Sequence, residues 1–357
     1  MMATDGRTMT AVLHTADVHL REDAPERLEA LRSVLELAER LEAEVLTIGG
    51  DLFDRPRDVE ELRGMLRGEL FSDRPFDILL IPGNHDVDAF RRDIHFGESC
   101  ITLLDTPYEH HELEEHDLRI TGVPYTEEPV EEVLLSLAER EPFEGTEALL
   151  LHCTLDIGFQ TGELGDEEEA RYFPVTADQL SELGFDCYLA GHFHNHSQRR
   201  LERGTFVYPG TPASTSTTET NQRRVVELDP DGDIGFHSLD TFHYASSTFS
   251  VLPGSEEETF ERIRRWVDEH VHEQTEATVT VEGFHSLDEE AFHRRVREAG
   301  GDVEVSDTHA SEVSRVQAHP IYKRFEERLK EHDWPPEEKN AVRRRMLEAF
   351  VAEGGAW

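Results

Sequence analysis

The chain has 357 residues, and at about 150 residues per domain this length predicts one large domain with a smaller appendage. Asp and Glu number 77 against 35 Lys and Arg, for a formal net charge of −42, yet 37% of the residues are hydrophobic and fall into periodic blocks, which argues against a disordered chain. No apolar run reaches the roughly 18 residues of a membrane span, and the polar N-terminus lacks the apolar stretch of a secretory signal, so we expect a cytoplasmic protein.

Strand-like and helix-like segments alternate through residues 9–245. Apolar residues spaced three and four apart predict helices at 25–41 and 62–70. Short apolar runs predict strands at 9–15, 45–48, 78–81, 148–151, 187–190, 205–208 and 225–228. Alternating strands and helices are typical of a layered α/β domain whose strands are buried on both faces. Residues 214–220 form a Ser/Thr-rich loop.

The pattern changes beyond residue 245. Strands at 248–252, 277–281 and 303–306 alternate with helices at 256–271 and 287–299, which predicts a compact second domain over residues 246–310. Residues 311–357 are helical and more basic, with helices at 321–332 and 336–352 separated by Pro335 and Pro336. We therefore expect three parts, with boundaries at 9–245, 246–310 and 311–357.

Five polar clusters follow predicted strands of the first domain. In open α/β sheets, ligands bind where the strands end. The clusters contain carboxylates, imidazoles and an amide, which are the ligands that suit Mn²⁺, Fe²⁺ or Zn²⁺. Their members are Asp17 and His19; Asp51; Asn84, His85 and Asp86; His152; and His192 and His194. Each cluster alone could be a turn, a helix cap or a solvated pair, but five in this order predict one metal centre.

Local geometry supports this prediction. On an extended backbone, Asp17 and His19 point to the same face, as do His192 and His194. Glycines at 50, 83 and 191 let the backbone turn sharply beside the clusters. The three cysteines, Cys100, Cys153 and Cys187, are far apart without a CxxC pair, which argues against a structural zinc site or a disulfide framework.

The order D-x-H, G-D, G-N-H-D, H and G-H-x-H resembles the calcineurin-like metallophosphoesterases over residues 11–245. Three segments are more similar to the DNA-repair nuclease branch, of the SbcD and meiotic-recombination-eleven type. They are residues 14–17 with Leu20, residues 50–54, and residues 208–212. The resemblance implies a β-sandwich flanked by helices, with a smaller α+β capping domain and a helical C-terminus.

The resemblance also implies a site with two divalent metal ions, Mn²⁺ above all. Asp17, His19 and His194 would hold the first ion, and Asn84, His152 and His192 the second. Asp51 would bridge the two ions. His85 would stand near the scissile phosphate as the catalytic acid or stabilising group, with Asp86 as its orienting partner. Asp54 stands where some archaeal members carry a histidine, and Arg21 replaces a common glycine.

We therefore expect a metal-dependent phosphodiesterase that acts on DNA, as exonuclease or endonuclease, in double-strand-break repair. The resemblance implies an SbcC-like (Rad-fifty-like) coiled-coil ATPase partner, bound through residues 311–357, and leaves a homodimer open. The apolar stripe at Val342, Met346 and Phe350 suits either such a partner or the protein's own core. Two alternatives remain: a phosphoesterase for nucleotides or phosphoproteins, and a regulatory subunit whose metal site serves assembly.

The basic residues are unusual, because only three are lysines, at 323, 330 and 339, and the other 32 are arginines. A surface dense in carboxylates repels itself in dilute salt, whereas at molar salt the Debye length shrinks to about 3 Å. We interpret the composition as that of a halophilic, salt-in cytoplasm. An acidic mesophilic protein is the alternative.

Overall fold

The computed structural model describes residues 10–90, 94–104, 108–155 and 172–352, without the side chains of 307 and 308. Residue 9, where the first predicted strand and domain begin, and residues 353–357 at the end of the predicted tail lie outside these ranges. The chain divides into two compact units, Met1–His243 and Tyr244–Trp357. The second unit contains both of the smaller predicted parts, and their predicted roles remain predictions.

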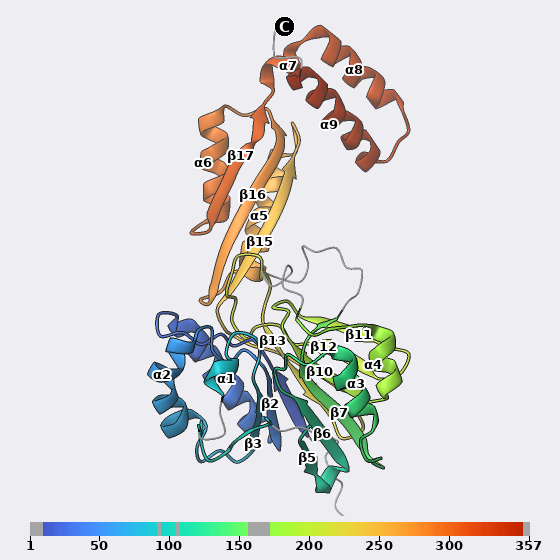
Figure 1. Cartoon of the computed structure of the whole chain (residues 1–357). Helices are drawn as coiled ribbons and strands as arrows, with labels where there is room; N and C mark the ends of the chain where they lie inside the picture. The colour runs from blue at the N-terminus through green and yellow to red at the C-terminus, as the bar shows by residue number, and fades with distance from the viewer. Residues whose placement is uncertain (1–9, 91–93, 105–107, 156–171, 353–357) are drawn as a thin grey trace, which may run out of the picture. The chain divides into compact units, whose positions relative to one another are not determined.

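Two six-stranded sheets form the first unit (Figure 1). One has the order β14-β13-β1-β2-β3-β4 and the other β11-β12-β10-β7-β6-β5. The strands of the first sheet are β1 (Val12–Thr15), β2 (Val45–Gly49), β3 (Asp77–Ile81), β4 (Cys100–Thr102), β13 (Arg224–Leu228) and β14 (Ile234–Ser238). Those of the second are β5 (His110–Leu113), β6 (Leu118–Val123), β7 (Thr146–His152), β10 (Cys187–Gly191), β11 (Ser197–Arg200) and β12 (Thr205–Tyr208). A separate short pair joins β8 (Thr154–Leu155) to β9 (Pro174–Val175).

The two sheets pack face to face, and helices cover their outer faces (Figure 1). In β3, Leu79 and Ile81 enter the core between the sheets, whereas Ile78 and Leu80 pack on the helix side. A strand buried on both faces needs an unbroken apolar run, which is why these segments are continuous and not alternating. The predicted layered α/β architecture is confirmed.

The helices of the first unit are amphipathic. α1 (Pro25–Arg40) and α2 (Pro56–Met65) pack on the first sheet, and α2 continues into the wider turn η1 (Leu66–Leu70). α3 (Val130–Ala138) and α4 (Ala177–Leu183) pack on the second sheet. A proline in the first turn of α1 and of α2 suits its position, since the N–H it lacks would have no helical partner there. The short 3₁₀ turns are η2 (Val87–Ala89) and η3 (Glu114–His116).

The second unit has a three-stranded sheet of β15 (His243–Val251), β16 (Thr275–His285) and β17 (Glu304–Glu312), in that order. α5 (Glu256–His270) and α6 (Glu289–Gly300) pack on it around Phe260 and Phe292. Three helices follow: α7 (Ser314–Ala318), α8 (Pro320–Glu331) and α9 (Pro336–Ala352). The predicted helical C-terminus is confirmed. Within the described residues, no helix combines the length and apolar character that a bilayer crossing requires.

Part of the predicted apolar stripe belongs to the protein's own core. Phe350 of the stripe, with the neighbouring Leu347 of α9, is buried against Phe284, Val313 and Tyr322. Met346 is partly buried against the same cluster. These side chains cannot serve as an exposed docking stripe while the helix keeps this packing.

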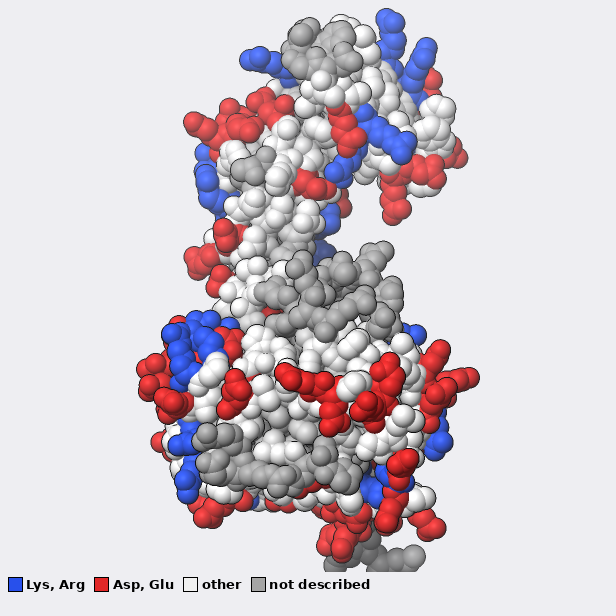
Figure 2. Space-filling model, viewed as in Figure 1, with Lys and Arg blue, Asp and Glu red and all other residues white. Residues whose placement is uncertain are grey.

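Charge is distributed unevenly over the visible surface (Figure 2). Asp and Glu side chains are spread over the face of the first unit that is in view. Lys and Arg side chains stand out on α8 and α9, where all three lysines lie. The negative charge is therefore a property of the folded surface and is not confined to a tail.

Candidate metal centre

The polar clusters lie at the carboxyl ends of parallel strands. β1, β2 and β3 run parallel to one another in the first sheet, and β7 and β10 run parallel in the second. The last residue of β7, His152, and the loops after the other four strands carry all the predicted site residues. Because the two sheets pack face to face, their strand ends bring residues from across the first unit to one place.

The backbone at these residues is not extended, so the sequence argument from alternating side chains is wrong in its geometry. Asp17, His19 and Asp51 have φ values of 53°, 47° and 50°, and His192 has 116°. Left-handed conformations are uncommon outside glycine, although Asp and His tolerate them better than most residues. Such conformations persist when surrounding contacts enforce them, and they gather at functional sites. Tight left-handed turns, and not a pleated strand, aim these side chains.

At two positions beside these clusters only glycine fits, because predicted ligand side chains approach the backbone closely there. Gly50 has φ of 99°, and a Cβ there would lie 2.3 Å from Nδ1 of His152. A Cβ on Gly83 would lie 2.2 Å from Oδ1 of Asp51. Any side chain at these two positions would displace a predicted ligand.

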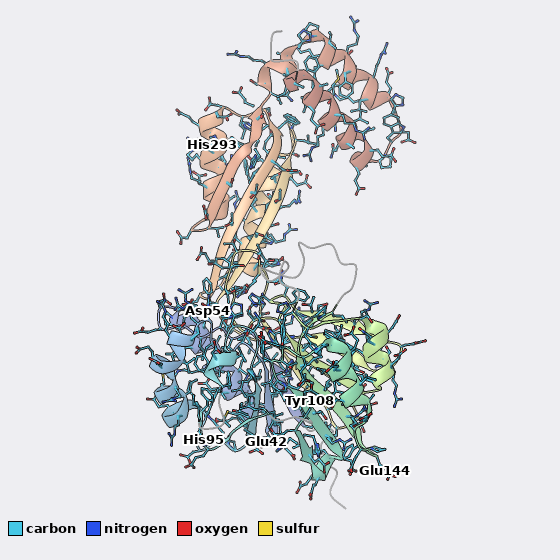
Figure 3. All side chains as sticks on the ribbon, viewed as in Figure 1. Glu42, Asp54, His95, Tyr108, Glu144 and His293 are labelled. Carbon is cyan, nitrogen blue, oxygen red and sulfur yellow. The ribbon has the colours of Figure 1, made fainter. Side chains whose placement is uncertain are left out.

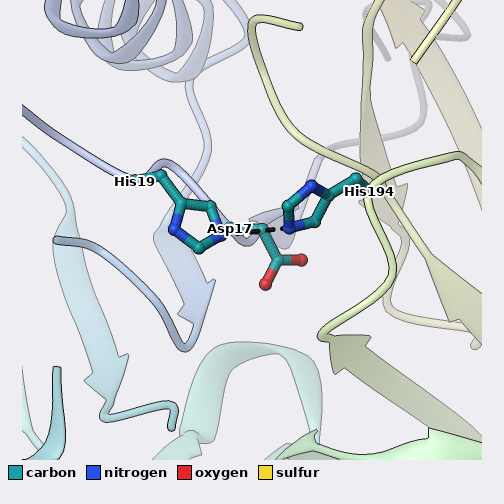
Figure 4. A group of neighbouring side chains, drawn as sticks. All are labelled: Asp17, His19 and His194. Atoms are coloured by element: carbon teal, nitrogen blue, oxygen red, sulfur yellow. Dashed lines mark hydrogen bonds between the residues drawn. The ribbon is translucent and has the colours of Figure 1, made fainter. Parts of the chain in front are cut away.

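The first cluster joins Asp17 and His19 with His194, whose ligand atoms all lie within 4.8 Å of one another. Figure 4 shows Nε2 of His19 facing Nε2 of His194, 3.1 Å away. All three side chains are buried. The backbone N–H of His192 donates to both carboxylate oxygens of Asp17 at 3.0 Å, while burial raises the pKa of Asp17 to about 7. Three buried groups with converging lone pairs form a donor set for a cation.

The second cluster forms around His152. Its Nε2 lies 2.9 Å from Oδ1 of Asn84 and 3.3 Å from Oδ2 of Asp51. The same oxygen of Asp51 lies 3.9 Å from Nε2 of His19, so this carboxylate stands between the two clusters. The ring of His192 is 5.3 Å from that of His152. The structure thus brings all seven predicted metal ligands to one location.

The protonation states of the buried carboxylates and imidazoles at this site depend on one another. Burial by itself would raise the pKa of Asp51, but the adjacent His152 and His19 hold it below its ordinary range. Burial would likewise lower the pKa of His152, yet the Asp51 carboxylate raises it to about 9. Burial lowers the pKa of His19. Metal binding requires deprotonated ligands, so a cation here would take the place of the proton on His152.

His85 and Asp86 follow the second cluster. The backbone N–H of His85 donates to Oδ1 of Asp51 at 2.9 Å, and its half-buried ring lies 4.9 Å from that of His19, edge to face. The carboxylate of Asp86 accepts from the backbone N–H groups of Gly83 at 2.8 Å and Phe53 at 3.1 Å. Asp86 therefore holds the backbone turn that carries His85, and direct orientation of the ring by Asp86 stays a prediction.

Two further carboxylates lie behind the histidines of the first cluster. Asp54 lies 3.4 Å from Nδ1 of His19, and Figure 3 shows it at the opposite end of the first unit from Glu42 and Glu144. The sequence singled out Asp54 only as a departure from a family pattern. Oε1 of Glu219 lies 2.7 Å from Nδ1 of His194. The sequence did not identify Glu219 as a site residue, because it lies 25 positions from His194 and no characteristic residue spacing links the two.

Two tyrosines line the neighbourhood of the second cluster. The rings of Tyr125 and Tyr172 stack in parallel with centroids 5.0 Å apart. The ring of Tyr172 is 5.7 Å from that of His152. Neither tyrosine was predicted as a site residue, because an isolated aromatic residue in a loop has no distinctive pattern.

Residues 10–196 match the family model described as calcineurin-like phosphoesterase. The chain is also 27% identical over 243 residues to the DNA double-strand break repair protein Mre11 of Aeropyrum pernix. That alignment covers 60% of this chain and 56% of the relative, so the chain spans about half the length of the curated relative it matches.

Solved structures similar to this chain include a protein of Thermus thermophilus, with a TM-score of 0.41 and 16% identity, covering 65% of this chain and 99% of that one. A dimetal phosphatase from Danio rerio gives a TM-score of 0.45 and 12% identity, covering 65% of this chain and 96% of that one.

Proposed function

The chain belongs to the calcineurin-like phosphoesterase family, whose members are metal-dependent hydrolases, and we propose that it is a two-metal phosphodiesterase that cuts DNA in double-strand-break repair. The observation that best supports this proposal is the position of Asp51 between two clusters of buried imidazole and carboxylate groups. A single structural metal would need only one of these clusters.

We assign the first ion to Asp17, His19 and His194, and the second to Asn84, His152 and His192, with Asp51 bridging. This chain's residues fit divalent cations in one specific respect. Oδ2 of Asp51 is buried, and among the described residues it has no aligned hydrogen-bond partner, although His152 lies 3.3 Å away. A buried carboxylate oxygen without a donor is costly unless a cation approaches it. Oxygen and imidazole donors suit Mn²⁺, our proposed metal.

Two bound cations would lower the pKa of a bound water and stabilise the charge of an in-line displacement at phosphorus. The protein's own groups orient the reaction. Asp51 fixes the backbone of His85 through its N–H, which keeps the half-buried imidazole beside His19. We propose that His85 donates a proton or hydrogen bond to the departing oxygen.

DNA is favoured over a small phosphomonoester by two observations. The relative from Aeropyrum pernix is a DNA double-strand break repair protein. The stacked pair of Tyr125 and Tyr172 beside His152 also offers aromatic surface of the kind on which unpaired bases stack. A nucleotide or phosphoprotein phosphoesterase and a metal-binding regulatory subunit are the alternatives. A cytoplasmic location and a homodimer stay predictions.

The test is Mn²⁺-dependent digestion of linear and hairpin DNA, compared with hydrolysis of a small phosphodiester, at molar KCl. We expect cleavage of both classes by the wild type and loss of both in Asp51→Ala, with one or both Mn²⁺ sites lost in calorimetric titration. Cleavage of the small diester alone would refute the DNA substrate. Undiminished two-site Mn²⁺ binding in Asp51→Ala would refute the bridging assignment.

We also propose that the C-terminal helices bind an SbcC-like (Rad-fifty-like) coiled-coil ATPase. The surface that we propose for this partner is not the α9 stripe expected from the sequence but a groove beside it. A groove of about 510 Å³ between α8 and α9 is lined by apolar residues together with Arg324 and Arg328. The apolar residues include Ile321, Phe325, Leu329, Trp334 and Val342. Ile321 is 53% exposed and Trp334 is 41% exposed. Exposed apolar side chains around one groove are typical of a helix-binding surface.

Co-purification with an SbcC-like ATPase tests this partner. Ile321→Glu should abolish capture because it places a charge in the groove, while hydrolysis of the small diester continues. Leu135→Glu is the matched control, since Leu135 is a similarly exposed apolar residue of α3 in the first unit. Equal capture of the wild type and Ile321→Glu would exclude the groove as the binding surface.

A further inference from the structure

Glu219 is a fully buried carboxylate behind the first cluster. It lies in the loop between β12 and β13, and its exposed fraction is 0%. Its Oε1 accepts a hydrogen bond from Nδ1 of His194 at 2.7 Å. A carboxylate only accepts when ionised, so Nδ1 must carry the hydrogen. In the neutral imidazole that metal binding requires, the lone pair of His194 is therefore on Nε2, the atom that faces His19.

Residues of the loop between β12 and β13, which contains the Ser/Thr-rich segment 214–220, hold this carboxylate in place. Oε2 of Glu219 accepts from the hydroxyl of Thr211 at 2.9 Å and from the backbone N–H of Thr215 at 2.7 Å. The hydroxyl of Ser214 donates to the backbone carbonyl of Glu219 at 2.6 Å. A buried charge without partners is costly, so this set of donors is what allows an ionised group to stay in the interior.

Arg223 ties the same loop to the ligand. Its Nε donates to the carbonyl of Thr211 at 2.9 Å, and one Nη donates to the carbonyl of His194. Arg223 is itself buried, with 4% of its surface exposed. Both ends of His194, its backbone carbonyl and its imidazole, are thus fixed by residues of one loop segment.

The two clusters differ in what lies behind their histidines. Behind the first cluster, His194 faces Glu219 at 2.7 Å and His19 faces Asp54 at 3.4 Å. Behind the second, Nδ1 of His152 lies 2.9 Å from the backbone carbonyl of Gly49, a neutral acceptor, and the carboxylate nearest to this nitrogen, that of Asp17 in the first cluster, is 3.8 Å away. A carboxylate hydrogen-bonded to a ligating histidine fixes its tautomer and raises its basicity, and it adds negative charge near the cation.

We propose that Glu219 is a positioning residue that holds Nε2 of His194 toward the metal and makes the position of Asp17, His19 and His194 the tighter of the two cation sites. The inference rests on the proposed metal centre but not on the DNA substrate. Absence of DNA cleavage alongside the expected metal-binding result would count against the substrate alone.

The test is calorimetric titration of the full-length protein with Mn²⁺, together with thermal unfolding. Wild type should bind in two steps. Glu219→Gln keeps the size and removes the charge, and we expect it to weaken the tighter step by about 10- to 100-fold, the usual effect of losing such a partner. The weaker step should keep its affinity, because Glu219 hydrogen-bonds to His194, a residue of the first cluster.

Glu147→Gln is the matched control. Glu147 of β7 is 8% exposed and ion-paired with Arg119 at 2.6 Å and Arg140 at 2.9 Å. Its substitution should lower the melting temperature while both Mn²⁺ steps keep their affinities. Equal loss of the tighter step in both variants would overturn the proposal, because it would make the role of Glu219 purely structural. An unchanged tighter step in Glu219→Gln would overturn it as well, because Glu219 would then have no part in metal binding.

A wild-type measurement covers the case in which Glu219→Gln does not fold. In protein labelled at the histidine nitrogens, the first equivalent of Zn²⁺ should shift the Nε2 resonances of His19 and His194 before that of His152. The reverse order, or simultaneous shifts of all three, would show that the first position is not the tighter one and would overturn the proposal.

Discussion

The buried imidazole of His14 makes the stability of the first unit depend on pH. His14 lies on β1 and is fully buried. Its Nδ1 lies 2.9 Å from the hydroxyl of Thr47 on β2, and its Nε2 lies 3.3 Å from the carbonyl of Ala190 on β10, in the opposite sheet. Burial lowers the pKa of His14 from 6.5 to about 4, so the imidazole is neutral in the folded protein at neutral pH.

The direction of the pH dependence follows from the number of protons that the folded and unfolded chains bind. Between pH 6.5 and 4 the unfolded chain binds a proton at His14 that the folded protein does not, so the free energy of unfolding falls as pH falls. The full difference corresponds to roughly 3 kcal/mol, and about 1 kcal/mol of it is lost between roughly pH 7.5 and 5.5. Above roughly pH 7.5 the contribution is essentially complete, because the unfolded chain then no longer binds the proton either.

Urea unfolding of the metal-free protein at molar KCl, at several pH values in that window, measures this effect. Other groups titrate in the same window, so the comparison is with His14→Gln, which should show a loss that is smaller by about 1 kcal/mol. His110→Gln, which removes an exposed histidine of β5, controls for the loss of one imidazole. Parallel pH profiles for wild type and His14→Gln would refute the reasoning.

Three further predictions concern the site and the surface. Gly50→Ala should weaken metal binding and hydrolysis, because the added Cβ would lie 2.3 Å from Nδ1 of His152 and the backbone φ at this position is 99°. Gly64→Ala in α2 is the control and should leave both properties unchanged, because a Cβ there meets no atom within 4 Å. Calorimetric titration and an activity assay compare the two variants. His85→Ala should keep both ions and lose about 10²- to 10⁴-fold in rate, the usual contribution of a positioned acid or base; loss of an ion in the titration would show that His85 is a ligand. The formal charge of −42 should make the melting temperature rise as KCl is raised from about 0.1 to 3 M, because the Debye length falls from about 10 Å to below 3 Å; a melting temperature that is flat or falls would remove the halophilic interpretation.

Several elements could be predicted because their signal is local. The helix predicted at 25–41 forms at Pro25–Arg40, and the strands predicted at 45–48, 78–81 and 187–190 form within a residue or so of those bounds. Strong apolar periodicity and unbroken apolar runs survive in the folded chain because both faces of these strands are buried. β5 and β11, which are largely polar edge strands, were not predicted, since their pairing partner and not their composition makes them strands.

The chemistry of the site could also be predicted in kind. The polar clusters after β1, β2, β3, β7 and β10 are visible in the sequence because ligand residues follow strand ends, and the structure gathers them. Their geometry could not be predicted. The left-handed backbone at Asp17, His19 and Asp51 replaces the extended backbone that the spacing suggested. Such conformations are unfavourable locally and exist because distant contacts enforce them.

The sequence by itself therefore determined which residue types meet at the centre, the order of the strands that carry them, and the acidic character of the surface. Only the tertiary structure decided which neighbouring residues hydrogen-bond to the residues of the metal centre. Glu219 reaches His194 across 25 positions of sequence, and Asp86 binds the backbone of Phe53 across 33. The fate of the α9 stripe is likewise tertiary, since Phe350 packs inside while Val342 lines a groove. Contacts between residues distant in sequence have no local pattern, because they arise from the packing of whole sheets and loops and not from the propensities of neighbouring residues.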